Sequence, residues 1–202
     1  MKILASADLH NNKQFAQALA HHAVHNEVDL VILCGDLGHA GHLPQEILGP
    51  FVEQQKKVLF VPGNHDAFVT AQVLAHVYGT TNMHNNTAVY GNVGFFGCGG
   101  ANIGPQFISE EDVYTALEQS HNKLPTIEHK ILISHMHPKG SVMEKISGCP
   151  GSQALRGIIE KFQPTLVLCG HIHEASGIEE KIGDTVVMNV AGMGKVLEFN
   201  EF

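Results

Sequence analysis

Two kinds of apolar segment alternate along this chain. Short runs without polar interruption, such as Leu30–Cys34, predict strands that are covered on both faces. Longer segments with apolar residues three or four positions apart predict amphipathic helices. In Asn11–Asn26, residues Phe15, Leu19 and Ala23 would share one face. Strands that alternate with helices at this chain length predict an α/β fold with a largely parallel sheet, either single or split into two layers.

The other expected elements follow the same two patterns. Expected β structure covers Lys2–Ala7, Val58–Val61, Ala88–Gly97, Ile131–Ser134 and Thr165–Cys169. Expected helices cover Leu43–Glu53, Phe68–Tyr78, Ser109–His121 and Ser152–Phe162, the last two with capping serines. The period-two tail Ile178–Phe199 predicts a hairpin and a final strand. Because no linker or repeat interrupts the chain, residues 1–202 are expected to form a single domain.

Asp, Asn and His residues follow five of the expected strands. If these strands are parallel and adjacent, their carboxyl ends share one edge, and the side chains that follow them converge there. Each short motif alone would be an ordinary turn, cap or loop, but their joint placement is hard to attribute to chance. Seven candidate ligands stand at these positions: Asp8, His10, Asp36, Asn64, His135, His171 and His173.

The composition of the chain supports a metal site. Histidine occurs 15 times, against 12 lysines and arginines together, and it is the commonest metal ligand. Oxygen and nitrogen donors without thiolate suit Mn, Fe or Zn, and we favour Mn for work in vitro. Seven candidates exceed the needs of one ion. We therefore expect two divalent metal ions about 3.5–4 Å apart, bridged by a carboxylate.

Charge and cysteine content exclude other classes of protein. The net charge of −8 and the single arginine, Arg156, argue against a nucleic-acid partner. Bound cations would neutralise an anionic substrate instead. No apolar run is long enough for a membrane span, and the N-terminus does not resemble a signal peptide. The four cysteines form no paired motif, so a cytoplasmic location with reduced thiols is expected.

The complete pattern resembles the signature of the calcineurin-like metallophosphoesterases. The matching motifs are Asp8-x-His10, Gly35-Asp36, Gly63-Asn64-His65-Asp66, His135 and Gly170-His171-x-His173. Residues 151–174 are similar to the Icc-related small phosphoesterases within that family. The resemblance implies a four-layer αββα sandwich of two mixed β-sheets flanked by helices. It also implies a metal-dependent hydrolase that acts on a small phosphodiester or phosphomonoester.

The same resemblance implies roles for the matching residues. Asp8, His10 and His173 would hold the first metal, Asn64, His135 and His171 the second, and Asp36 would bridge them. A hydroxide held between the metals would attack phosphorus, because metal binding lowers the pKa of water to about 7. His65 would donate a proton to the leaving oxygen. Asp66 would orient the imidazole of His65 or favour its protonated form.

Some expectations concern the surroundings of the site. Candidate substrate contacts are His39, His137 and Asn102, and the turn Gly97–Asn102 is expected to approach the metals. Residues 140–150 are expected to form a long connection that shapes one wall of the pocket. Diester hydrolysis is favoured over monoester hydrolysis. The alternative is a non-catalytic binding scaffold of the same fold, which would have no need of the acid His65. The apolar tail leaves a dimer possible.

Overall fold

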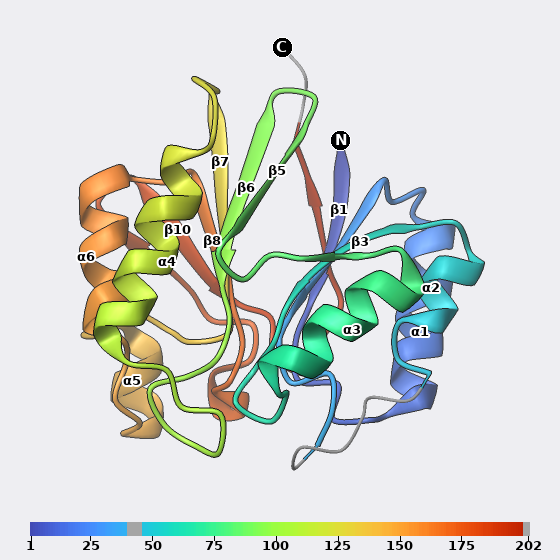
Figure 1. Ribbon diagram of the computed structural model, residues 1–202, viewed down its shortest axis with the longest axis horizontal. Coiled ribbons are helices and arrows are strands. Elements are labelled where there is room, and N and C mark those ends of the chain that lie inside the picture. Colours follow the sequence, from blue (N-terminus) through green and yellow to red (C-terminus); the bar gives the residue numbers. More distant parts are fainter. Residues whose placement is uncertain (40–45, 200–202) are drawn as a thin grey trace.

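The computed structural model describes residues 1–39 and 46–199, which form four layers (Figure 1). Two mixed β-sheets pack face to face, and helices cover both outer faces, as an αββα sandwich requires. The fold class predicted from the sequence is therefore confirmed. No helix in these two described ranges is long and apolar enough to cross a membrane.

The first sheet has five strands in the order β11-β1-β2-β3-β4. Strands β1 to β4 are parallel, and β11 runs antiparallel to β1. Their bounds are β11 Lys195–Glu198, β1 Lys2–Ser6, β2 Leu30–Cys34, β3 Lys57–Val61 and β4 Thr81–Asn82.

The second sheet has six strands in the order β5-β6-β7-β8-β10-β9. The four central strands are parallel, and the two edge strands run antiparallel to their neighbours. Their bounds are β5 Asn86–Tyr90, β6 Val93–Cys98, β7 His129–Ser134, β8 Leu166–Cys169, β10 Thr185–Asn189 and β9 Glu179–Ile182. The predicted tail is confirmed: β9 and β10 form the hairpin, and β11 returns to the first sheet.

Each sheet has its own set of helices. The helices α1 Lys13–His25, α2 Gly49–Glu53 and α3 Phe68–Tyr78 pack on the first sheet. The helices α4 Glu110–Asn122, α5 Val142–Ser147 and α6 Gln153–Phe162 pack on the second, and a 3₁₀ turn, η1, spans His173–Ala175. The capping serines predicted for α4 and α6 accept hydrogen bonds from Asp112 N–H and Leu155 N–H at 3.1 Å.

Strand β2 shows how an apolar run is covered from both sides. Val31 and Leu33 point toward the helices of the first sheet, whereas Leu30, Ile32 and Cys34 point between the sheets. All five side chains are buried. Alternate residues of one strand thus belong to two different cores, which is why the sequence shows an unbroken apolar run rather than a polar–apolar alternation.

Two expected boundaries differ from the structure. The helix expected over Leu43–Glu53 is found only as Gly49–Glu53, with Pro50 in its first turn; the earlier part of that range overlaps residues outside those described. The connection expected over residues 140–150 contains the helix α5, which Ser141 caps by accepting from Glu144 N–H. The turn signals on both sides of α5 hid this short helix.

Candidate metal centre

The carboxyl ends of the parallel strands meet at one edge of the molecule, below the two sheets in Figure 1. Asp8 and His10 follow β1, Asp36 follows β2, and His135 follows β7. The sequence places Asn64 after β3, and His171 and His173 after β8, at the same edge. The structure therefore brings together ligand candidates that lie far apart in the sequence.

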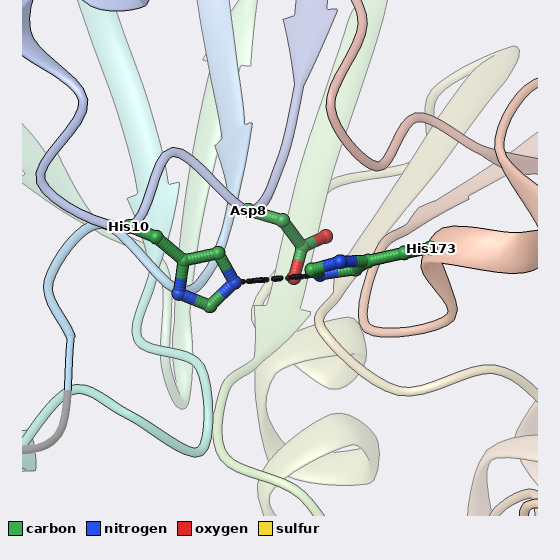
Figure 2. Close-up of side chains that lie close together, drawn as sticks. All are labelled: Asp8, His10 and His173. Atoms are coloured by element: carbon green, nitrogen blue, oxygen red, sulfur yellow. Dashed lines mark hydrogen bonds and ion pairs between the residues drawn. The ribbon is translucent and has the colours of Figure 1, made fainter.

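The first cluster of ligand atoms, named here the outer group, consists of Asp8, His10 and His173 (Figure 2). One oxygen or nitrogen from each lies within 4.8 Å of the others. Asp8 Oδ1 is 3.3 Å from His173 Nε2 and 3.8 Å from His10 Nε2. The two Nε2 atoms are 3.3 Å apart. These are the three residues that the resemblance implies for the first metal.

A second cluster, the inner group, consists of Asp8, Asp36 and His135, whose ligand atoms also lie within 4.8 Å of one another. Asp36 Oδ2 is 3.5 Å from His135 Nε2 and 3.8 Å from His10 Nε2, so this oxygen lies near both groups. The amide Oδ1 of Asn64 is 2.9 Å from His135 Nε2.

The donor set fits a cation at the outer group. Asp8 Oδ1 is buried and has no hydrogen-bond partner of acceptable geometry, which is costly for a carboxylate oxygen. The Nε2 atoms of His10 and His173 face each other beside this oxygen. If both rings are neutral, only one of the two nitrogens can donate a hydrogen bond to the other. A divalent cation would satisfy the oxygen and both nitrogen lone pairs at once.

Backbone contacts hold His135 in a tautomer suited to metal binding. Its ring is fully buried, and Nδ1 donates to the carbonyl of Cys34 at 2.8 Å. In the neutral imidazole, Nε2 then carries the lone pair and is directed toward Asp36 and Asn64. A hydrogen bond of this kind fixes the orientation of a ligating histidine and raises its basicity.

The acidic and basic groups perturb one another's pKa values. Burial alone would raise the pKa of the Asp8 carboxyl, but His173, His135 and the backbone N–H of His171 lower it below its usual value. Burial raises the pKa of Asp36. Burial and the neighbouring His135 lower the pKa of His171 to about 3. His171 is therefore neutral and free to offer a lone pair at ordinary pH.

The ligand loops are conformationally strained. Asp8, His10, Asp36 and His171 all have left-handed backbone conformations, with φ of 60°, 45°, 51° and 71°. Non-glycine residues adopt this region at a cost of about 1–2 kcal/mol each, and such residues gather at functional sites. These left-handed residues stand just after β1, β2 and β8, where the chain leaves the sheet and the ligands are placed at its edge.

Glycine is required where two of these loops touch. A Cβ on Gly63 would collide with the carboxylate and backbone nitrogen of Asp36. A Cβ on Gly170 would lie 2.6 Å from Asp8 Oδ2. The glycines of the two motifs therefore allow the close approach of loops that carry ligands.

The carboxylate of Asp66 joins two of the loops. It accepts hydrogen bonds from the backbone N–H groups of Leu37, Gly38 and Gly63 at 2.9, 2.7 and 2.9 Å. These bonds tie the loop that carries Asp36 to the loop that carries Asn64. This contact with the backbone is a positioning role that the sequence did not reveal.

A pocket of about 620 Å³ opens over the ligand cluster. His65 and His39 line it with stacked rings, their centroids 5.2 Å apart, and His65 N–H donates to Asp36 Oδ1 at 2.8 Å. Glu174 also lines the pocket, although it was not predicted from the sequence. The one indication of its position in the sequence is that it directly follows the ligand candidate His173. The lining residues are His10, Asp36, His39, Asn64, His65, His171, His173 and Glu174.

Two expected substrate contacts do not line this pocket. His137 is 1% exposed, and its Nε2 donates to the carbonyl of Cys149 at 3.1 Å. Asn102 Nδ2 donates to Glu110 and to the carbonyl of Pro150, both at 3.3 Å. Both side chains hold the segment around residues 149 and 150 in place. That segment reaches the site through the Cys149 thiol, whose Sγ is 4.0 Å from His171 Nε2.

The turn Gly97–Asn102 and the residues that follow it are hydrogen-bonded to the segment that follows β3. Gly100 N–H donates to the carbonyl of Pro62 at 2.8 Å, and Gln106 N–H donates to the carbonyl of Asn64 at 3.0 Å. The loop thus supports the strand end that carries Asn64 and His65.

The fold and the ligand cluster are those of a metal-dependent phosphoesterase. The sequence profile of the calcineurin-like phosphoesterases matches residues 1–175, and the chain belongs to this family. No curated protein matches the chain.

Solved structures share the fold at low sequence identity. TT1561 of Thermus thermophilus is 20% identical, with a TM-score of 0.75 over 93% of this chain and 88% of that one. A novel archaeal phosphodiesterase is 16% identical, with a TM-score of 0.55 over 94% and 82%. A dimetal phosphatase from Danio rerio is 12% identical, with a TM-score of 0.53 over 94% and 86%.

Proposed function

We propose that the chain hydrolyses a small phosphoester with the help of two divalent cations. The observation that carries the proposal is the position of Asp36. Its Oδ2 lies 3.8 Å from a histidine nitrogen of the outer group and 3.5 Å from that of the inner group. A carboxylate between two sets of ligands is the arrangement that a metal pair needs.

The outer group would hold one cation, and Asp36 would be shared. Asn64, His135 and His171 would hold the other; the rings of His135 and His171 have centroids 5.0 Å apart. When bound, the cations would supply positive charge for the phosphate oxygens and a water of lowered pKa. The nitrogen and oxygen donors suit Mn, Fe or Zn, and Mn is our choice for assays.

His65 would act as the general acid. It lines the pocket and follows Asn64 directly, and its Nε2 is 4.0 Å from Asp36 Oδ2. Its backbone bond to Asp36 fixes the residue beside the cluster, and the stacked ring of His39 limits where the imidazole can move. Proton donation to a leaving oxygen by such a group is worth typically about 10²–10⁴-fold in rate.

The pocket favours a small diester as substrate. Its volume of about 620 Å³ is typical of small-molecule sites. The neighbouring imidazoles of His39 and His65 offer a flat surface for the second ester substituent. The structural neighbours include both a phosphodiesterase and a phosphatase, so the preference for diesters rests on the pocket.

The test combines metal analysis with kinetics. The purified chain, loaded with Mn, should contain two ions and cleave a chromogenic diester faster than the matched monoester. His65→Ala should keep both ions and lose most turnover, because only the acid is removed. A histidine outside the cluster, His76 on α3, gives a control variant, His76→Ala, with unchanged turnover.

A second outcome would favour the binding scaffold. If the chain binds two ions but cleaves neither ester, or if His65→Ala is as active as the parent chain, the proposed hydrolytic role is wrong. Turnover of the monoester alone would instead reverse the preference for diesters.

A further inference from the structure

The helix α3 carries a stripe of exposed valines. Val69, Val73 and Val77 are 73, 52 and 67% exposed. They are four positions apart, so they form one row along the outer face of the helix. The opposite face is covered: Ala71, Leu74 and Ala75 are buried against the first sheet.

The exposed side of α3 carries no Asp, Glu, Lys or Arg, and its exposed polar residues are Gln72 and His76. Residues 67–109 contain no Asp, Glu, Lys or Arg, although these types make up 16% of the chain. The exposed side of α6, by contrast, carries the ion pair Arg156–Glu160 at 2.6 Å. Valine is also a weaker helix former than Ala, Glu or Lys, so neither solvation nor helix propensity accounts for this row.

We infer that the valine row of α3 is the contact between two copies of this chain. Each copy has a net charge of −8, so two copies repel one another wherever their charged surfaces meet. Because α3 itself carries none of the four charged residue types, two copies can approach along this helix with less of that cost. A charged partner is a poorer fit, because α3 itself offers no charged side chain with which such a partner could pair.

The row has the form needed for a symmetric contact. Residues at i, i+4 and i+8 form one ridge, and two such ridges pack with helix axes crossing at about −50°. Because the row is centred on Val73, a two-fold axis beside this residue places it against Val73 of the second copy. Val69 then faces Val77 of the second copy, and Val77 faces Val69 of the second copy, so both ends of the row are covered.

A further exposed apolar side chain lies near the start of α3. Phe107 is 64% exposed and lines a hollow of about 360 Å³ together with Phe68 and the acidic Asp112. Even with Phe107, the apolar area is smaller than the roughly 800 Å² per partner of a standard interface. The dimer is therefore weak, and its population rises with protein concentration.

Sedimentation over a wide range of protein concentrations tests this contact. The parent chain should shift from monomer to dimer as the concentration rises. Val73→Asp should weaken the association at least ~10-fold, because it places two like charges at the symmetry axis. The matched control is Val24→Asp on α1, where Val24 is 44% exposed; it adds the same charge and should change the association less than about 2-fold.

Charge reversal at the axis provides the second measurement. Val73→Lys alone should also weaken the dimer, whereas an equal mixture of Val73→Asp and Val73→Lys should associate again, because opposite charges then meet. Unfolding of one variant cannot produce this recovery. A parent chain that stays monomeric throughout, or equal weakening by Val24→Asp, would overturn the inference. So would a mixture that fails to associate while both variants melt like the parent chain.

Discussion

The outer and inner groups share Asp8 but differ in their surroundings. In the outer group, the side chains of His10 and His173 are 24 and 59% exposed. In the inner group, those of His135 and Asp36 are 0 and 3% exposed. The inner ligands are fixed by the core of the protein itself, whereas His173 belongs to a short 3₁₀ turn at the surface. We therefore expect the inner site to bind its cation more tightly and to exchange it more slowly.

The largest effect is expected from the residue between the two groups. Asp36→Asn keeps the size of the side chain but removes the charge near His10 and His135. Turnover should fall at least ~100-fold, beyond the loss typical of groups outside the ligand set, and both cations should bind more weakly. Calorimetric titration with Mn²⁺ and assay of the same sample measure the two effects.

Loss of only one cation from Asp36→Asn would contradict the shared position of this carboxylate. Gln106→Ala offers a control, because its side chain is outside the ligand cluster while its backbone N–H can still bond Asn64. That variant should bind both cations with unchanged affinity.

Removal of one histidine from each group compares how much the two groups contribute to the stability of the metal-free chain. His135→Ala opens a cavity and leaves the carbonyl of Cys34 without its donor. The free energy of unfolding of the metal-free chain should fall by about 2–4 kcal/mol. His173→Ala removes a mostly exposed ring and should change it by less than about 0.5 kcal/mol. Urea unfolding in the presence of a chelator measures both.

Equal destabilisation by the two histidine variants would show that the inner group is no more embedded than the outer. Each variant should nevertheless weaken cation binding, and this common effect shows that a stable His173→Ala chain has still lost a ligand.

A smaller loss of stability is expected from the carboxylate of Asp66, which bonds three backbone N–H groups of two loops. In Asp66→Asn, the new amide group can accept fewer of the three N–H bonds, and its NH₂ faces a backbone donor. The expected loss of stability is about 1–3 kcal/mol, with turnover reduced because Asp36 and Asn64 are less firmly placed. Asp184→Asn, in the turn of the β9–β10 hairpin, is the matched control. Unchanged stability of Asp66→Asn would remove the positioning role of its carboxylate.

The strand ends were the part of the site that sequence could predict. A buried parallel strand appears as an apolar run, and the residues after it must lie at one edge, so the places of Asp36 and His135 followed from pattern alone. The direction of a side chain beyond a loop does not follow in this way. His137, two positions after His135, turns inward because the carbonyl of Cys149 offers a partner there. Asp66 likewise bonds backbone groups from another loop, and no local pattern encodes that contact.

The two proposed cation sites, the outer group and the site of Asn64, His135 and His171, should also differ in their sensitivity to acid. The neighbouring Asp8 raises the pKa of His173, whereas burial and His135 lower the pKa of His171 to about 3. A cation at the outer group must displace a proton from His173 as soon as the pH falls below that raised pKa, while His171 remains deprotonated until far lower pH. On acidification, the outer cation should therefore leave first.

Proton NMR titration of the histidine rings in the metal-free chain checks the two pKa values directly. His173 should titrate above 6.5, its ordinary value, and His171 should stay neutral throughout the mildly acidic range. In the Mn-loaded chain, binding isotherms at falling pH should change from two sites to one. His173→Ala should abolish this step, because the first proton competitor is gone along with the exposed ligand. Simultaneous loss of both cations at one pH would mean that the shared carboxylates couple the two groups more strongly than their different burial separates them.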